Sequence, residues 1–93
     1  MNPPDPIGEY RVTSHAAFEM ARRGIDEDLL RRVLARPEQR WTVRRGRDLL
    51  QSRIAFEGKE YLVRVFLDVD RRPPEIVTVY RTSNVVKYWR SGQ

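Results

Sequence analysis

The chain has 93 residues, 40% of them hydrophobic and 33% charged, a balance that predicts one small globular domain. It has no cysteine, which excludes disulfides, thiolate nucleophiles and zinc–sulfur sites, and its single histidine, His15, argues against a histidine-based metal site. The net charge of +5 comes mainly from arginine and indicates a polyanion or an acidic protein as partner, although a GC-rich genome produces the same bias.

The first eight residues contain three prolines and a glycine, and we expect them to form a flexible arm. Residues 9–90 are then a single domain, and 91–93 are a tail. No apolar run approaches the roughly 20 residues of a membrane-spanning helix, and the N-terminus lacks the apolar core of a signal peptide. These features predict a cytoplasmic protein with no membrane partner.

Two helices are predicted after a short strand at residues 9–13. Ser14 is the expected N-cap of a helix over 15–23, and Gly24 closes that helix. Asp26 caps a second helix, which Pro37 ends. The expected buried side chains are Ala17, Phe18, Met20 and Ala21 on the first helix and Leu29, Leu30, Val33 and Leu34 on the second.

Four strands follow, at residues 39–44, 48–56, 60–68 and 75–82, with turns at Gly46 and at residues 57–59. Their spacing predicts an antiparallel meander covered on one face by the helix hairpin. Residues 85–89 are expected to form a short helix or extension. The predicted fold is therefore α+β, in the order β-α-α-β-β-β-β.

Two arginines on the last strands are candidate phosphate ligands. Arg64 shares a strand face with Leu62 and Phe66, where a charge is costly unless it is paired. Its partner is either a carboxylate, such as Glu60 or Asp48, or an anion held together with Arg81, if both arginines point to the same rim of the sheet.

Other candidates lie on the first helix and the first hairpin. His15 is a conceivable general base, or it stacks on Tyr10 or bonds the helix cap; Glu19 lies four residues on. A basic run with one aromatic residue suits a nucleic-acid groove, or is a solvated hairpin tip in which the tryptophan belongs to the core. That run consists of Arg40, Trp41, Arg44, Arg45 and Arg47.

The stretches "SHAAFEMARRGI" (residues 14–25) and "IVTVYR" (76–81) resemble a small uncharacterised bacterial family that looks like part of the RelE/ParE-type toxin superfamily. The resemblance covers about residues 9–90. It implies two helices on a four-stranded antiparallel sheet and, in many relatives, cleavage of mRNA at the ribosome without a metal or cofactor. It assigns phosphate binding and proton transfer to Arg64, Arg81, Tyr80 and Tyr88, with Lys87 as a further candidate.

The leading hypothesis is thus the toxin of a toxin–antitoxin system, acting as a metal-independent mRNA endoribonuclease, with His15, Tyr80 or Tyr88 handling protons. One alternative is a non-catalytic toxin that binds a protein such as DNA gyrase. Another is a non-toxic basic module that binds nucleic acid. Both toxin hypotheses imply a small acidic antitoxin as partner.

Overall fold

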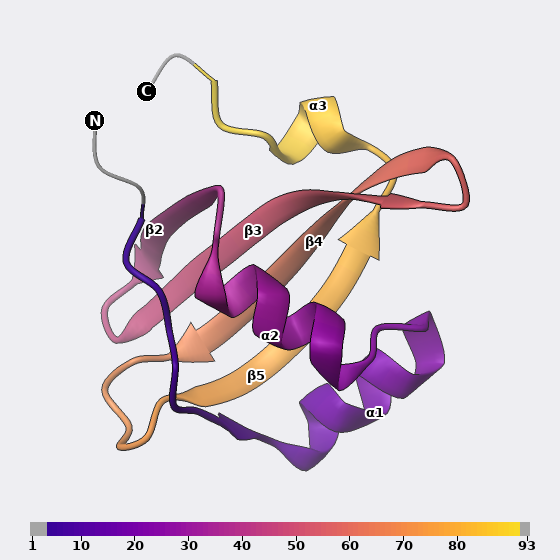
Figure 1. Ribbon diagram of the computed structural model, residues 1–93. Coiled ribbons are helices and arrows are strands. Elements are labelled where there is room, and N and C mark those ends of the chain that lie inside the picture. The colour runs from indigo at the N-terminus through magenta and orange to yellow at the C-terminus, as the bar shows by residue number, and fades with distance from the viewer. Residues whose placement is uncertain (1–3, 92–93) are drawn as a thin grey trace.

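The computed structural model of the protein describes residues 4–91 and has an α+β fold, as predicted. Helices α1 (Ser14–Arg23) and α2 (Glu27–Ala35) lie on one side of a sheet, and the short α3 (Val85–Tyr88) follows its last strand (Figure 1). The strands are β1 (Arg11–Val12), β2 (Gln39–Arg44), β3 (Arg47–Phe56), β4 (Lys59–Asp68) and β5 (Glu75–Thr82).

The five strands form one mixed sheet in the order β1-β5-β4-β3-β2. Strands β2 to β5 make the predicted antiparallel meander. The short β1 instead pairs in parallel with β5, so the sheet as a whole is not antiparallel. A connection through two helices returns the chain from β1 to the far edge of the sheet at β2, and this separates the two edge strands.

Helix α1 begins one residue earlier than the sequence suggests. Thr13, not Ser14, is the N-cap: its hydroxyl oxygen accepts a hydrogen bond from Ala16 N at 3.2 Å and donates one to Ile76 O at 2.9 Å. Thr13 therefore joins the start of α1 to β5, which a serine one position later does not do.

We expect Thr13→Ala to lower the free energy of unfolding by about 1–2 kcal/mol, because it removes both the cap and the bond to β5. Ser14→Ala, which leaves the cap intact, is the matched control and should change stability by less than about 0.5 kcal/mol. Urea denaturation of both variants measures the difference. Equal losses in the two variants would contradict the assignment of Thr13 as the cap.

The two helices cover the sheet with a single apolar core. Leu30, Val33 and Leu34 of α2 are completely buried, which confirms the predicted stripe. On α1 the buried positions are Ala16, Glu19 and Met20, whereas Phe18 is 63% exposed and Ala17 and Ala21 are also exposed. The prediction for these three side chains was wrong because the helix packs through the face of Ala16 and Met20; Phe18, two positions from each, points to solvent, where Arg22 lies over its ring.

A β-bulge on β5 changes which of its side chains meet the core. Phe66 pairs with Thr78, but Leu67 pairs with Ile76, so Val77 is an extra residue. Ile76 and Val79 consequently lie on the same face and are both fully buried. Strict alternation, which placed Ile76 on the face of Tyr80, is wrong at this point.

The turns between β2 and β3 and between β3 and β4 lie at the predicted positions, and each contains a glycine. Gly46 and Gly58 both have positive φ, at 81° and 80°. A Cβ at Gly46 would also lie 2.7 Å from Asp70 Oδ2, so the β2–β3 turn packs against the loop that follows β4. Any other residue here would have to adopt a positive φ and displace the Asp70 carboxylate.

The second face of the sheet is covered by residues 83–91, here called the closing segment. The Trp89 ring lies 4.1 Å from Arg53 Cζ, and Arg90 Cζ lies 4.3 Å from the centre of the Trp41 ring. Beneath these contacts Leu49 and Leu62 are fully buried. This face is therefore packed, although no buried residue comes from α3 itself.

Residues 1–3 of the predicted arm lie outside the described residues. Ile7 packs against the core, and its N–H donates to Leu34 O at 2.8 Å.

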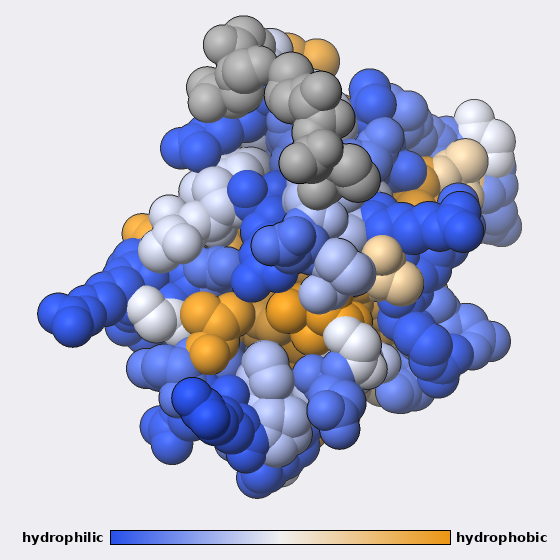
Figure 2. All heavy atoms as spheres, turned by 60° about the vertical axis from the view of Figure 1, so that its left-hand side comes forward, coloured by the Kyte–Doolittle hydropathy of each residue, from blue (hydrophilic) through white to orange (hydrophobic). Residues whose placement is uncertain are grey.

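On the face seen in Figure 2, hydrophobic side chains gather in one central band surrounded by hydrophilic ones. Within residues 4–91, no helix has the length and apolar character to span a bilayer.

Candidate functional site

Arg64 is the one buried arginine among the described residues, at 8% exposure, and it lies on the second face of the sheet. Its Nε donates to Gln51 Oε1 at 2.8 Å, and its Nη1 donates to the Tyr80 hydroxyl at 2.6 Å. Neither acceptor is charged, and no carboxylate among residues 4–91 forms an ion pair with it. The predicted pairing with Glu60 or Asp48 is therefore wrong.

One edge of the Arg64 guanidinium is unused. Its Nη2 makes no hydrogen bond within residues 4–91, yet no buried side-chain nitrogen or oxygen in that part of the chain lacks a partner. Nη2 therefore reaches solvent. A guanidinium with two N–H groups already held and a free edge is pre-organised to bind an anion.

Aromatic rings surround this guanidinium. The Tyr88 ring centre lies 4.5 Å from Arg64 Cζ, and those of Phe66 and Tyr80 lie 5.5 and 5.7 Å away. Phe66 and Tyr80 are stacked with centroids 6.3 Å apart. The rings cover part of the cation without cancelling its charge, so the attraction of its exposed edge for an anion is strengthened.

Arg81 lies on the opposite face of the sheet from Arg64. In the β4–β5 register Arg64 pairs with Tyr80, whereas Arg81 pairs with Val63 on the core side. The Arg81 guanidinium lies over the rings of Phe56 and Tyr61, at 4.4 and 4.8 Å. The expectation that both arginines point to one rim is wrong, because neighbouring positions of the two strands face opposite ways.

His15 does not join the Arg64 site. It is exposed on the first turn of α1, and within residues 4–91 its side chain forms no hydrogen bond or ion pair. Glu19, four residues on, instead binds Arg22 and Arg23. Arg23 is the residue of α1 that approaches the site: its Nη1 donates to Val79 O at 3.2 Å, and its Cζ lies 5.8 Å from the Tyr80 ring.

The residues of the basic run in the first hairpin make different contacts and do not all share one environment. Arg40 forms an ion pair with Asp48 at 2.9 Å, and Arg47 forms one with Asp68 at 2.8 Å. Trp41 packs against Arg90, and Arg44 and Arg45 are exposed. Lys87 is also exposed, with Nζ 5.2 Å from the Tyr88 ring. Only part of the predicted basic groove therefore carries an unpaired charge.

A family model described as a domain of unknown function, DUF4258, matches residues 12–81. This span is well over half of the chain. The chain belongs to the DUF4258 family. A search of curated proteins and a search of solved structures each gave no match.

The DUF4258 match includes Arg64 and Tyr80, and it ends at Arg81, before the closing segment. Tyr88 therefore comes from outside the matched span. The rings around Arg64 thus combine two residues of the DUF4258 domain proper, Phe66 and Tyr80, with one residue that follows it.

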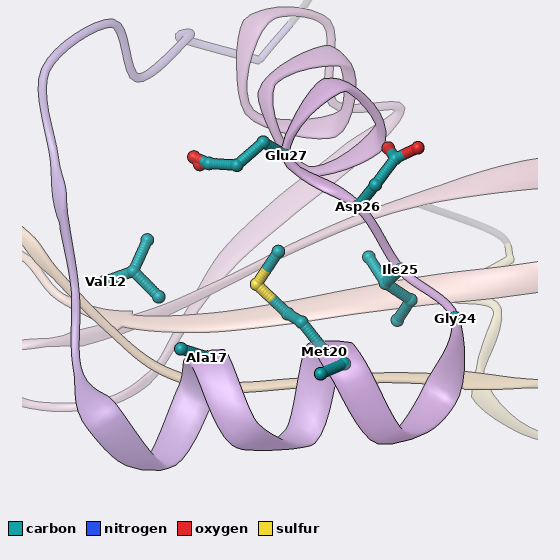
Figure 3. Close-up of a pocket in the computed structure, with 8 residues that line it drawn as sticks. Val12, Ala17, Met20, Gly24, Ile25, Asp26 and Glu27 are labelled. Carbon is teal, nitrogen blue, oxygen red and sulfur yellow. The ribbon is translucent and has the colours of Figure 1, made fainter.

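A separate groove of about 550 Å³ lies between α1 and the start of α2 in the DUF4258 domain. In Figure 3 the Met20 side chain points from α1 into this space, with Val12 on one side and Ile25 on the other. Its acidic residues have structural roles: Asp26 caps α2, and Glu27 lies on the first turn, where the helix dipole favours a negative charge. None of the groove's lining residues contacts Arg64.

Three site residues of the DUF4258 domain were not predicted from the sequence: Gln51, Gln39 and Arg23. Gln51 is completely buried on β3 and binds Arg64 directly. A signal was present, because a glutamine in a strand whose other residues are mostly apolar requires a polar partner. Gln39 and Arg23 had no such signal, since both lie at positions where polar residues are common.

The Arg47–Asp68 pair makes the stability of the DUF4258 domain depend on pH. The hydrogen bond from Arg47 lowers the pKa of the Asp68 carboxyl below its ordinary value. Its stabilisation is therefore complete above the unfolded pKa of about 3.9 and is lost as the pH falls through the lower folded value.

Within residues 4–91, no group of three or more acidic or histidine side chains is arranged to hold a metal.

We expect Asp68→Asn to cost about 0.5–1 kcal/mol at pH 7, a modest value because both partners are partly exposed. The difference from the wild-type protein should disappear as the pH falls through the lowered folded pKa of Asp68, below which both proteins lack the charge. Asp70→Asn, which keeps the hydrogen bond, is the control. Chemical denaturation between pH 2 and 7 tests this, and a cost that is independent of pH would contradict it.

Proposed function

We propose that this DUF4258 protein is the toxin of a toxin–antitoxin system and acts as a metal-independent mRNA endoribonuclease that inhibits translation. The observation that carries the proposal is Arg64, a buried arginine whose hydrogen-bond partners are all uncharged and whose Nη2 is free. Two hydrogen bonds and three aromatic rings stabilise this cation without cancelling its charge, so it is available to bind an anion. The RelE/ParE resemblance identifies the proposed anion as an RNA phosphate. The α+β fold supports this assignment.

In the proposed reaction, the 2′-hydroxyl of RNA attacks the adjacent phosphorus, which gives a 2′,3′-cyclic phosphate and releases the 5′-oxygen. Arg64 binds the non-bridging oxygens, on which negative charge grows. Tyr80 accepts a hydrogen bond from Arg64, so its own proton remains available for the leaving 5′-oxygen. The proton of the 2′-hydroxyl passes to water.

The roles of the other predicted residues follow from where they lie. Tyr88 covers one face of the guanidinium. Arg81 and His15 take no part in this reaction, because the first lies on the other face and the second is exposed on α1. Exposed arginines without a carboxylate partner among the described residues form the proposed contact surface for RNA, the ribosome and a small acidic antitoxin in the cytoplasm. They are Arg32, Arg36, Arg44, Arg45, Arg71, Arg72 and Arg90.

The proposal is tested by incubating the purified protein with mRNA, both ribosome-bound and free, in the presence of EDTA, and mapping the cleaved ends by primer extension. We expect cleavage that persists in EDTA and falls by about 100- to 10,000-fold in Tyr80→Phe, which lacks the phenolic proton. The matched control is Tyr61→Phe, a tyrosine on the opposite face. Growth arrest on induction with intact mRNA would instead support a protein-binding toxin, and no arrest would support a non-toxic module.

A further inference from the structure

Gln51 uses both ends of its side-chain amide inside the protein. Its Oε1 accepts from Arg64 Nε at 2.8 Å, and its Nε2 donates to Gln39 Oε1 at 2.8 Å and to Tyr88 O at 3.2 Å. Gln39 continues the chain of bonds: its Oε1 accepts from Arg90 N at 3.1 Å, and its Nε2 donates to Arg90 O at 2.6 Å. This amide relay links Arg64 to the backbone of the closing segment.

The relay fixes the Arg64 guanidinium without neutralising it. A guanidinium held at Nε by β3 and at Nη1 by β5 cannot rotate, so the direction of its free edge is set. A carboxylate in place of the Gln51 amide would hold it equally well but would also pair with its charge. The Gln51 amide therefore orients the Arg64 guanidinium without forming an ion pair with it.

The same relay sets the position of the ring above Arg64. Because Gln51 binds Tyr88 O and Gln39 binds both backbone polar groups of Arg90, the closing segment is aligned at the residue that stacks on the guanidinium. Helix α3 itself buries no residue and has no side-chain cap, so the alignment depends on the relay and on the contacts of Trp89 with Arg53 and of Arg90 with Trp41. One fully buried glutamine thus places both the cation and its aromatic cover.

We infer that Gln51, supported by Gln39, is a positioning residue for phosphate binding by Arg64, and that it keeps the guanidinium oriented and uncompensated for an RNA phosphate. The inference rests on the proposed function for the identity of the ligand. The inference itself states that Arg64 binds a phosphate only while Gln51 is neutral and bonded to it. Phosphate binding can be measured without RNA cleavage, so this statement is tested independently.

The decisive variant is Gln51→Glu, which keeps the size of the side chain and its acceptor oxygen but places a carboxylate against Arg64. Inorganic phosphate is titrated into the full-length protein while the Nε–Hε NMR resonance of Arg64 is followed, and RNA cleavage is measured in parallel. We expect Gln51→Glu to fold with a lower melting temperature, because its carboxylate cannot donate the two bonds that Gln51 Nε2 makes, and to lose phosphate affinity by about 10- to 100-fold and cleavage by at least as much. A merely structural glutamine would lower stability and leave the phosphate affinity of the folded protein unchanged.

Asn84→Asp is the matched control, because it makes the same amide-to-carboxylate change at an exposed position that has no side-chain cap bond. It should bind phosphate and cleave RNA like the wild-type protein. Wild-type phosphate affinity in Gln51→Glu, or an Arg64 resonance that does not respond to phosphate in the wild-type protein, would overturn the inference.

If Gln51→Glu does not fold, Gln51→Met decides the question, since it keeps the volume and removes the bonds without adding charge. A folded Gln51→Met with weakened phosphate binding and faster exchange of the Arg64 Nε–Hε proton supports the inference, whereas wild-type binding overturns it. If neither variant folds, Gln51 is structural and the inference fails. A wild-type protein that binds phosphate through Arg64 but does not cleave RNA would contradict the proposed function and leave this inference standing.

Discussion

Arg64→Lys is expected to reduce RNA cleavage by about 100- to 1,000-fold, although it keeps the positive charge. A lysine ammonium has no planar fork, so it cannot hold Gln51 and Tyr80 and present a free edge at the same time. The lost bond leaves the buried Gln51 carbonyl without its partner, which should also cost about 1–3 kcal/mol of stability. Cleavage kinetics and urea denaturation measure the two effects separately.

Arg81→Lys is the matched control for this prediction. Both arginines lie on adjacent strands and contact two or more aromatic rings, but they lie on opposite faces. Arg81→Lys should therefore weaken packing against Phe56 and Tyr61 and leave cleavage within about threefold of the wild-type rate. Equal loss of cleavage in both variants would show that the site does not lie at Arg64 alone.

Leu49→Ala is expected to lower the free energy of unfolding by about 2–4 kcal/mol, even though Leu49 lies outside the core beneath the helices. Its side chain is completely buried between its cross-strand neighbours Trp41 and Phe66. Truncation would leave a cavity in the layer that supports Arg64. Thermal and urea denaturation measure the loss.

Val43→Ala, which shortens a 42%-exposed side chain on the neighbouring strand, should cost less than about 0.5 kcal/mol. We also expect Leu49→Ala to reduce RNA cleavage, because the cavity would loosen the rings around the guanidinium. If Leu49→Ala costs no more than Val43→Ala, the second face is not a packed layer, and the closing segment contributes little to the fold.

Much of the fold was predictable because local signals agreed with one another. The Gly24 and Asp26 caps, the apolar stripe of α2 and the glycine turns at residues 46 and 58 each fix a boundary through backbone geometry alone. The alternating pattern also identified the core face of β4 correctly, with Val63, Val65 and Leu67 fully buried. These features depend on a few neighbouring residues, and a single sequence contains them.

The site was less predictable because it depends on register. The prediction singled out Arg64 correctly as a costly position, but pairing it with Arg81 required knowing which residues lie opposite each other across β4 and β5. The bulge at Val77 and the parallel pairing of β1 leave no clear local signal. The bonds from Gln51 and Gln39 to the closing segment span 37 and 51 positions, so no local pattern predicts them.

The closing segment also has a consequence for the time at which the site forms. A ribosome makes the chain from the N-terminus, and a domain can begin to fold while its later residues are still being added. All five strands and both core helices precede residue 83, whereas Tyr88 and the Arg90 backbone, which complete the surroundings of Arg64, follow it. A nascent chain therefore exposes its five strands before the residues that complete the site, and it cannot assemble this arrangement while those residues remain inside the ribosome that is making it.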